Sequence, residues 1–112
     1  MKRRRGSALR VVLVTAPPPA ARSLARALVE RRLAACANLL PGVRSVYRWK
    51  GRVEEARETL LLLKTTTACV PALLAAVREL HPYEVPEGIA IPVVAALEDY
   101  AAWVREEVTP PR

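Results

Sequence analysis

The stretch TLLLLK at residues 59–64 decides the fold of this chain. Successive side chains of a strand point to opposite faces of its sheet, so four consecutive leucines are apolar on both faces. The segment LRVVLVT at residues 9–15 is also apolar at nearly every position. A sheet with one face in water alternates polar and apolar residues instead. Both strands therefore need apolar cover on their two faces.

The elements around these two strands follow from hydrophobic periodicity and turn signals. Apolar residues at helical spacing predict helices after the prolines at 17–19 and after the threonines at 65–67. Lys50-Gly51 is a turn signal, which makes 52–64 the return strand of a long hairpin. The expected order is a strand at 9–15, a helix to about 34, a strand at 37–49 interrupted at Pro41-Gly42, a strand at 52–64, a helix to 80, a strand at 89–94 and a helix at 96–108. This α+β order is that of a ferredoxin-like split βαβ antiparallel sheet with an added C-terminal helix.

One face of such a sheet lacks cover within the chain. Two helices cover the other face, so we expect an oligomer packed through the open sheet faces. The hairpin at 44–58 is longer than this sheet needs, and we expect its edge to reach a neighbouring chain. Tyr47 and Trp49 share one face of the hairpin and are expected at the subunit interface, where aromatic residues concentrate. The alternative is a monomer whose closing helix folds under the sheet.

Length and charge restrict the classes of protein that fit. The 112 residues suit one domain at 8–108, with a disordered basic tail at 1–7 and a C-terminal stub at 109–112. Four charges of the net +7 lie at residues 2–5, so nucleic acid is not an expected partner. No apolar run approaches the roughly 20 residues of a membrane span, and we expect a cytoplasmic protein without a membrane partner.

The segment LHPYEVPE at residues 80–87 holds the side chains best suited to a site. It contains the only histidine, His81, and the carboxylates Glu84 and Glu87, between prolines that restrict the backbone. Neutral imidazole and carboxylates bind Cu²⁺ and other divalent cations. We therefore expect a weak, unselective metal site on these three residues, completed by a neighbouring chain. The alternative is that His81 caps the preceding helix.

A polar pocket between subunits is a second hypothesis for the same region. Lys64 ends the central strand, while Cys36 and Asn38 lie at the start of the second strand. The predicted members of this pocket are Cys36, Asn38, Lys64, His81, Tyr83 and Glu87. The alternative is a satisfied polar network that holds the subunits together.

The sequence does not favour an enzyme. It contains no GxSxG, no phosphate-binding P-loop and no GxGxxG. The presence of cysteine and histidine as residue types is weak evidence for a catalytic pair.

Four segments, LAACAN at 33–38, PGVRSVYRWKG at 41–51, KTT at 64–66 and HPYEVPE at 81–87, resemble the CutA family of divalent-cation tolerance proteins in order and spacing. The resemblance covers about residues 11–104. It implies a homotrimer of ferredoxin-like subunits, similar in architecture to the PII signalling proteins, that binds copper or other divalent cations.

The chain departs from this family at one position. Some bacterial members carry a cysteine just before the TAP segment that has been proposed as a copper ligand, and Val14 stands there in this chain. We expect no mechanism that depends on that thiolate. Two alternatives remain open: a PII-like regulator that binds a small anionic molecule or a protein in its intersubunit cleft, and a purely structural trimer.

Overall fold

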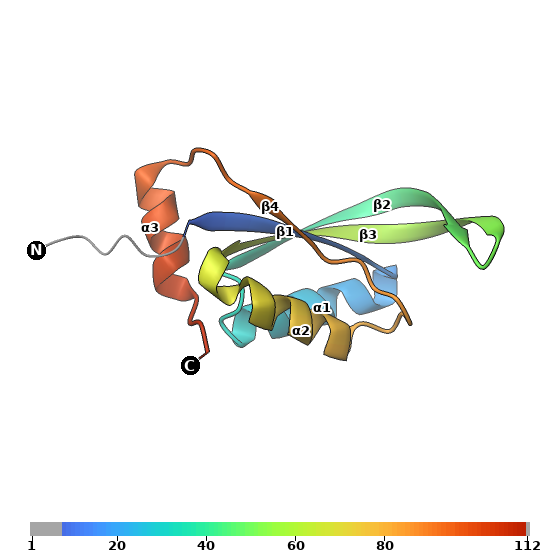
Figure 1. Cartoon of the computed structure of the whole chain (residues 1–112), viewed down its shortest axis with the longest axis horizontal. Coiled ribbons are helices and arrows are strands. Elements are labelled where there is room, and N and C mark those ends of the chain that lie inside the picture. Colours follow the sequence, from blue (N-terminus) through green and yellow to red (C-terminus); the bar gives the residue numbers. More distant parts are fainter. Residues whose placement is uncertain (1–7, 112) are drawn as a thin grey trace, which may run out of the picture.

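The computed structural model describes residues 8–111, so the tail predicted at 1–7 lies outside the described residues. The elements run in the order β1 (Leu9–Ala16), α1 (Pro18–Glu30), β2 (Cys36–Trp49), β3 (Arg52–Thr66), a short 3₁₀ turn (Thr67–Cys69), α2 (Val70–Leu80), β4 (Ile89–Pro92) and α3 (Glu98–Glu107). This arrangement confirms the predicted ferredoxin-like fold with an added C-terminal helix (Figure 1). Within the described residues, no helix is long and apolar enough to span a membrane.

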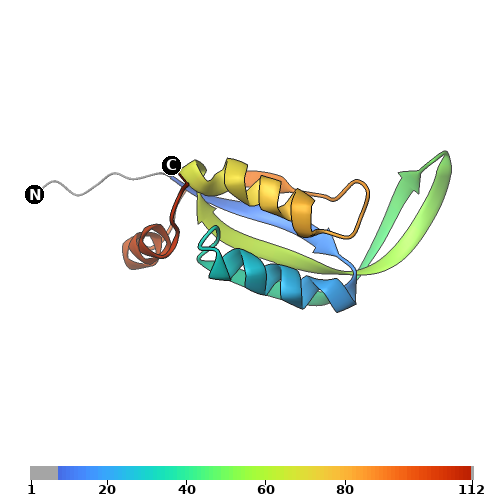
Figure 2. The same ribbon diagram turned by 90° about the horizontal axis from the view of Figure 1, so that it is seen from below.

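The sheet is antiparallel throughout, with the strand order β2-β3-β1-β4. Helices α1 and α2 lie side by side on one of its faces (Figure 2). Val12 and Val14 of β1 and Leu61 and Leu63 of β3 are fully buried beneath these helices. The residues that alternate with these four along β1 and β3 therefore point to the opposite face of the sheet.

That opposite face is apolar and largely uncovered in the described part of the chain. Its central side chains are half-buried, and its edge carries Ile89 and Ile91, which are 51% and 40% exposed. Helix α3 packs Ala101 and Val104 against Leu9, so it covers only the end of the face where β1 begins. The predicted open face is thus present, and the closing helix does not fold under the whole sheet. The half-buried residues are Val11, Leu13, Leu60 and Leu62.

The hairpin of β2 and β3 projects well beyond the two helices (Figure 1). Its two-residue turn, Lys50-Gly51, has positive φ at both positions (50° and 80°), the requirement of a type I′ hairpin. Leu40 pairs with Leu60 and Val43 with Glu58, so β2 advances by three residues where β3 advances by two. The extra residue of β2 defines a β-bulge at Pro41-Gly42. The expected interruption of this strand is therefore a bulge inside one continuous strand.

The bulge decides which side chains of the hairpin join the open face. Leu60 and Glu58 lie on one face of β3 because they are two residues apart. Their partners across the ladder, Leu40 and Val43, therefore share that face despite an odd spacing. Tyr47 and Trp49 follow Val43 at even intervals, so they continue the open face of the sheet onto the hairpin.

Several element bounds differ from those predicted, and the differences in α1, β4 and α3 are the larger ones. Helix α1 ends at Glu30 rather than near Ala34, because Arg32 has a left-handed backbone conformation (φ 61°) that stops the helix. Strand β4 ends at Pro92, whose ring nitrogen has no hydrogen to donate to a further ladder bond. Helix α3 spans Glu98–Glu107, slightly shorter than the predicted 96–108.

Candidate functional site

The imidazole of His81, in the candidate site, is held by two hydrogen bonds. His81 occupies the position after the last residue of α2, and its backbone amide donates to the carbonyl of Val77. Its Nε2 atom lies 2.8 Å from the carbonyl oxygen of Thr15, and its Nδ1 atom accepts from the amide of Tyr83 at 3.1 Å. Since Nδ1 accepts, Nε2 carries the proton and donates it. The ring is 6% exposed and has no free lone pair for a metal ion.

The two carboxylates predicted as metal ligands have different surroundings. Glu87 is half-buried and accepts a hydrogen bond of 2.9 Å from the hydroxyl of Thr15. Glu84 is exposed on the same loop. Across the described residues 8–111, no three His, Cys, Asp or Glu side chains form a group that could hold a metal ion. Within one chain, His81, Glu84 and Glu87 therefore do not form a metal centre.

A hydrogen bond between Tyr83 and Glu58 ties the loop to the base of the hairpin. The Tyr83 hydroxyl donates to Oε2 of Glu58 over 2.8 Å, and Glu58 is only 4% exposed. Burial, followed by the hydrogen bond to Glu58 and the negative charge of Glu58, raises the pKa of Tyr83 to about 12. The phenol therefore stays protonated and remains a donor at neutral pH.

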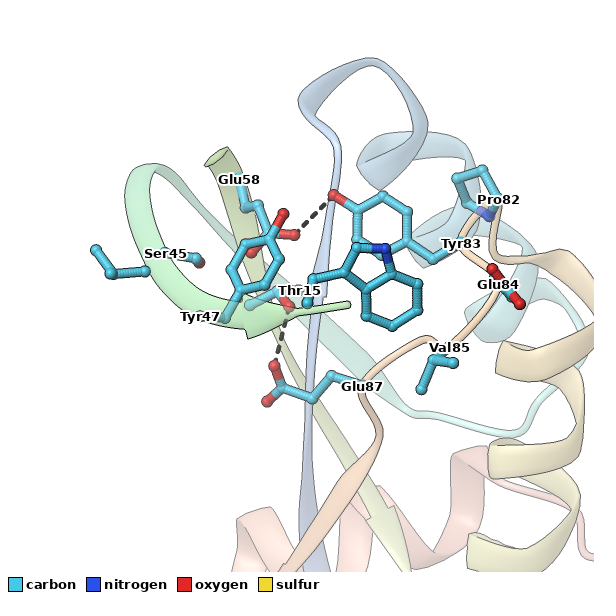
Figure 3. Close-up of a pocket in the computed structure, with 11 residues that line it drawn as sticks. Thr15, Ser45, Tyr47, Glu58, Pro82, Tyr83, Glu84, Val85 and Glu87 are labelled. Atoms are coloured by element: carbon cyan, nitrogen blue, oxygen red, sulfur yellow. Dashed lines mark hydrogen bonds between the residues drawn. The ribbon is translucent and has the colours of Figure 1, made fainter. Parts of the chain in front are cut away.

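An open pocket of about 720 Å³ lies beside these contacts, between the hairpin and the loop after α2. Figure 3 shows side chains from β1, the hairpin and the loop converging on it. Its lining residues are Thr15, Ser45, Val46, Tyr47, Trp49, Glu58, Pro82, Tyr83, Glu84, Val85 and Glu87. Tyr47 and Trp49, predicted as interface residues, thus line this pocket together with Tyr83 and Glu87.

Sequence reasoning missed Glu58 and Thr15. Glu58 closes the polar run of β3, where its residue type does not distinguish it from Glu54 and Glu55. The only available signal was its place directly before the TLLLLK stretch, where the hairpin meets the sheet. Thr15 is a polar side chain near the end of a strand that is apolar elsewhere except at Arg10.

The other predicted pocket residues gather at the far end of the sheet. The ammonium group of Lys64 donates to Oδ1 of Asn38 and lies 3.9 Å from the sulfur of Cys36. Burial, together with this sulfur, raises the pKa of Tyr100 on α3. Lys64 pairs with Val11, four residues along β1 from Thr15.

The six predicted pocket residues therefore form two clusters within one chain. Four residues on β1 separate the clusters by roughly 13 Å along the strand. Cys36, Asn38 and Lys64 belong to one of them, and His81, Tyr83 and Glu87 to the other. Only a second chain could bring the two sets to one pocket.

Val14, which stands where the family resemblance would place a cysteine in some members, is fully buried in the core. Its side chain is 0% exposed and packs beneath the helices. It contributes neither a ligand atom nor access for a metal ion.

Comparisons with known proteins agree with this architecture. A model of the CutA1 divalent ion tolerance protein family matches residues 10–107. The divalent-cation tolerance protein CutA of Thermus thermophilus is 53% identical over 97 residues, which cover 86% of this chain and 94% of that protein.

Two solved structures extend the likeness to the fold. The PII-like protein CutA from Nostoc, in apo form, has a TM-score of 0.87 at 38% identity, covering 91% of this chain and 99% of that one. The periplasmic divalent cation tolerance protein CutA from Archaeoglobus fulgidus has a TM-score of 0.86 at 31% identity, covering 90% and 99%.

The fold and its likeness to the Nostoc structure define a PII-like protein of the ferredoxin-like class. The chain belongs to the CutA1 divalent ion tolerance family, as its sequence resemblance predicted. It is therefore a divalent-cation tolerance protein and not an enzyme.

Proposed function

We propose that this chain works as a homotrimer whose pocket, between hairpin and loop, receives a small ligand or a partner group in the response to divalent cations. The pocket of about 720 Å³ carries this proposal, because Tyr83, Glu84 and Glu87 of the predicted site residues line it and it is large enough for a small molecule. The trimer is the assembly that the family resemblance implies.

The uncovered sheet face supports an assembly. Leucines and isoleucines of β1, β3 and β4 form an apolar surface that no described element of this chain covers beyond its end at Leu9. Burial of apolar surface stabilises by about 25 cal/mol per Å², so association through this face is favourable. The pocket opens along the continuation of this face onto the hairpin, and Tyr47 and Trp49 therefore lie where a neighbouring chain would approach.

Direct binding of copper or another divalent cation is the second candidate. Glu84 and Glu87 line one pocket, and their carboxylates suit divalent cations. His81 would join them only if the cation displaced the carbonyl of Thr15 from Nε2 or the amide of Tyr83 from Nδ1. Two carboxylates without the imidazole would bind weakly and with little selectivity.

Titration calorimetry with Cu²⁺ and Zn²⁺ separates the two candidates. The wild type, the His81→Ala variant and the Glu84→Gln/Glu87→Gln double variant are compared in their assembled form. The pocket proposal expects weak metal binding that is the same in wild type and His81→Ala. Tight binding that disappears in His81→Ala would instead make the metal the ligand of this loop.

The cytoplasmic location remains a prediction. The relative from Archaeoglobus fulgidus is described as periplasmic. Fractionation of the cells that produce this protein would decide its compartment.

A further inference from the structure

A buried carboxylate without a cationic partner lies in the wall of the pocket. Glu58 is 4% exposed, and within residues 8–111 the one hydrogen-bond partner of its carboxylate is the neutral hydroxyl of Tyr83. Among residues 8–111, no lysine, arginine or histidine forms an ion pair with it. A buried charge without a partner is strongly unfavourable, and buried charges are ordinarily paired.

The rest of the pocket has the same electrostatic character. Glu84 and Glu87 add two further carboxylates, and none of the eleven lining residues is basic. The apolar part of the wall comprises the rings of Tyr47, Trp49 and Tyr83 together with Val46, Pro82 and Val85. Three carboxylates without a counterion disfavour an anionic ligand, so the pocket of this chain does not suit the small anion considered from the sequence.

Aromatic rings beside carboxylates are the surroundings that organic cations prefer. A cation over the face of tryptophan or tyrosine is attracted by the electrons of the ring. A guanidinium group also stacks on rings through its planar face and donates paired hydrogen bonds to a carboxylate. An inorganic cation would gain little from the rings.

We infer that this pocket binds a guanidinium group, with Glu58 as its charge partner and Tyr47 and Trp49 as its stacking surface. The group can belong to a small molecule or to an arginine side chain of a polypeptide, since both present the same chemistry. This inference rests on the proposed function of the pocket and specifies the class of its ligand.

Calorimetric titration of the full-length protein with butylguanidinium tests the inference, with butylurea as its uncharged counterpart. We expect saturable binding of butylguanidinium and no binding of butylurea. In Glu58→Gln the affinity should fall by about tenfold or more, since a charge-assisted hydrogen bond is lost. Glu98→Gln removes the same charge from the exposed start of α3 and should bind like the wild type.

A capped Gly-Arg-Gly peptide distinguishes the two sources of the group. Preference for the peptide assigns an arginine side chain, and preference for butylguanidinium assigns a small molecule. Binding of neither probe, or equal binding of butylurea, would overturn the inference. Should Glu58→Gln fail to fold, Trp49→Leu replaces it, with the same expected loss.

Sedimentation of the same samples keeps the two proposals apart. A trimer that binds neither probe would contradict the guanidinium inference and leave the assembly standing. A monomer that binds butylguanidinium would contradict the proposed trimer and leave the ligand class standing.

Discussion

The Nε2 atom of His81 lies 2.8 Å from the carbonyl oxygen of Thr15, and this contact joins the loop after α2 to the end of β1. The same loop returns to β1 through Glu87, which accepts from the Thr15 hydroxyl. The only histidine of the chain therefore holds one wall of the pocket in place. This role explains its burial without a metal ion.

Replacement of His81 by alanine should destabilise the fold by about 2–4 kcal/mol, because it leaves a cavity and an unpaired carbonyl. Urea unfolding at a fixed protein concentration measures the loss in free energy of unfolding. Unchanged stability would show that the contact with Thr15 contributes nothing, and the structural role assigned to His81 would then be wrong.

The titration of Tyr83 should depend on Glu58. In the wild type, the tyrosinate absorbance measured against pH should include one transition with a pKa of about 12. This transition should be absent in Tyr83→Phe. In Glu58→Gln this pKa should fall toward 10.0 without reaching it, because burial is the largest cause of the shift. An unchanged pKa in Glu58→Gln would contradict the contact between these side chains.

The raised pKa of Tyr83 also predicts a loss of stability at high pH. The unfolded chain ionises near pH 10.0, whereas the folded chain holds the proton until about 12. The contribution of Tyr83 is therefore complete below pH 10 and is lost as the pH rises toward 12. Unfolding measured across this window should show a smaller decline for Tyr83→Phe than for the wild type.

Neighbouring leucines of β3 should respond differently to truncation. Leu63 is fully buried beneath the helices, so Leu63→Ala should lower the free energy of unfolding by about 2–5 kcal/mol. Leu62 points to the open face and is half-buried within one chain. The Leu62→Ala variant should weaken association more than folding, which a dilution series followed by sedimentation would measure. Equal effects of both changes on an isolated monomer would contradict this assignment of faces.

A charge on the open face should prevent assembly. Leu62→Glu places a carboxylate among apolar side chains, and we expect it to sediment as single chains with the circular dichroism of the folded protein. Val29→Glu, on the partly exposed side of α1, is the matched control and should assemble like the wild type. Retained assembly of Leu62→Glu would exclude this face as the interface.

Most of the fold was predictable because it depends on the hydrophobic pattern. The strands at 9–15 and 59–64 are apolar on both faces, and this feature predicted both the sheet and its uncovered face. Local backbone geometry was not predictable in the same way. The left-handed conformation of Arg32 ends α1 early, and arginine as a residue type does not predict this conformation.

The site was predictable only in part, because its central contacts involve groups that a sequence does not distinguish. The loop at 80–87 and the aromatic pair Tyr47 and Trp49 were identified from residue types. The bond from His81 goes to a backbone carbonyl, which every residue has. The register of β1 against β3 places Lys64 away from His81. This register is seen only once the strands are paired in the structure.

Sedimentation equilibrium of the wild-type protein at micromolar concentration tests the proposed assembly most directly. The uncovered apolar face and the family resemblance predict a particle of three times the chain mass of 12.3 kDa. A single species of 12.3 kDa under these conditions would contradict it.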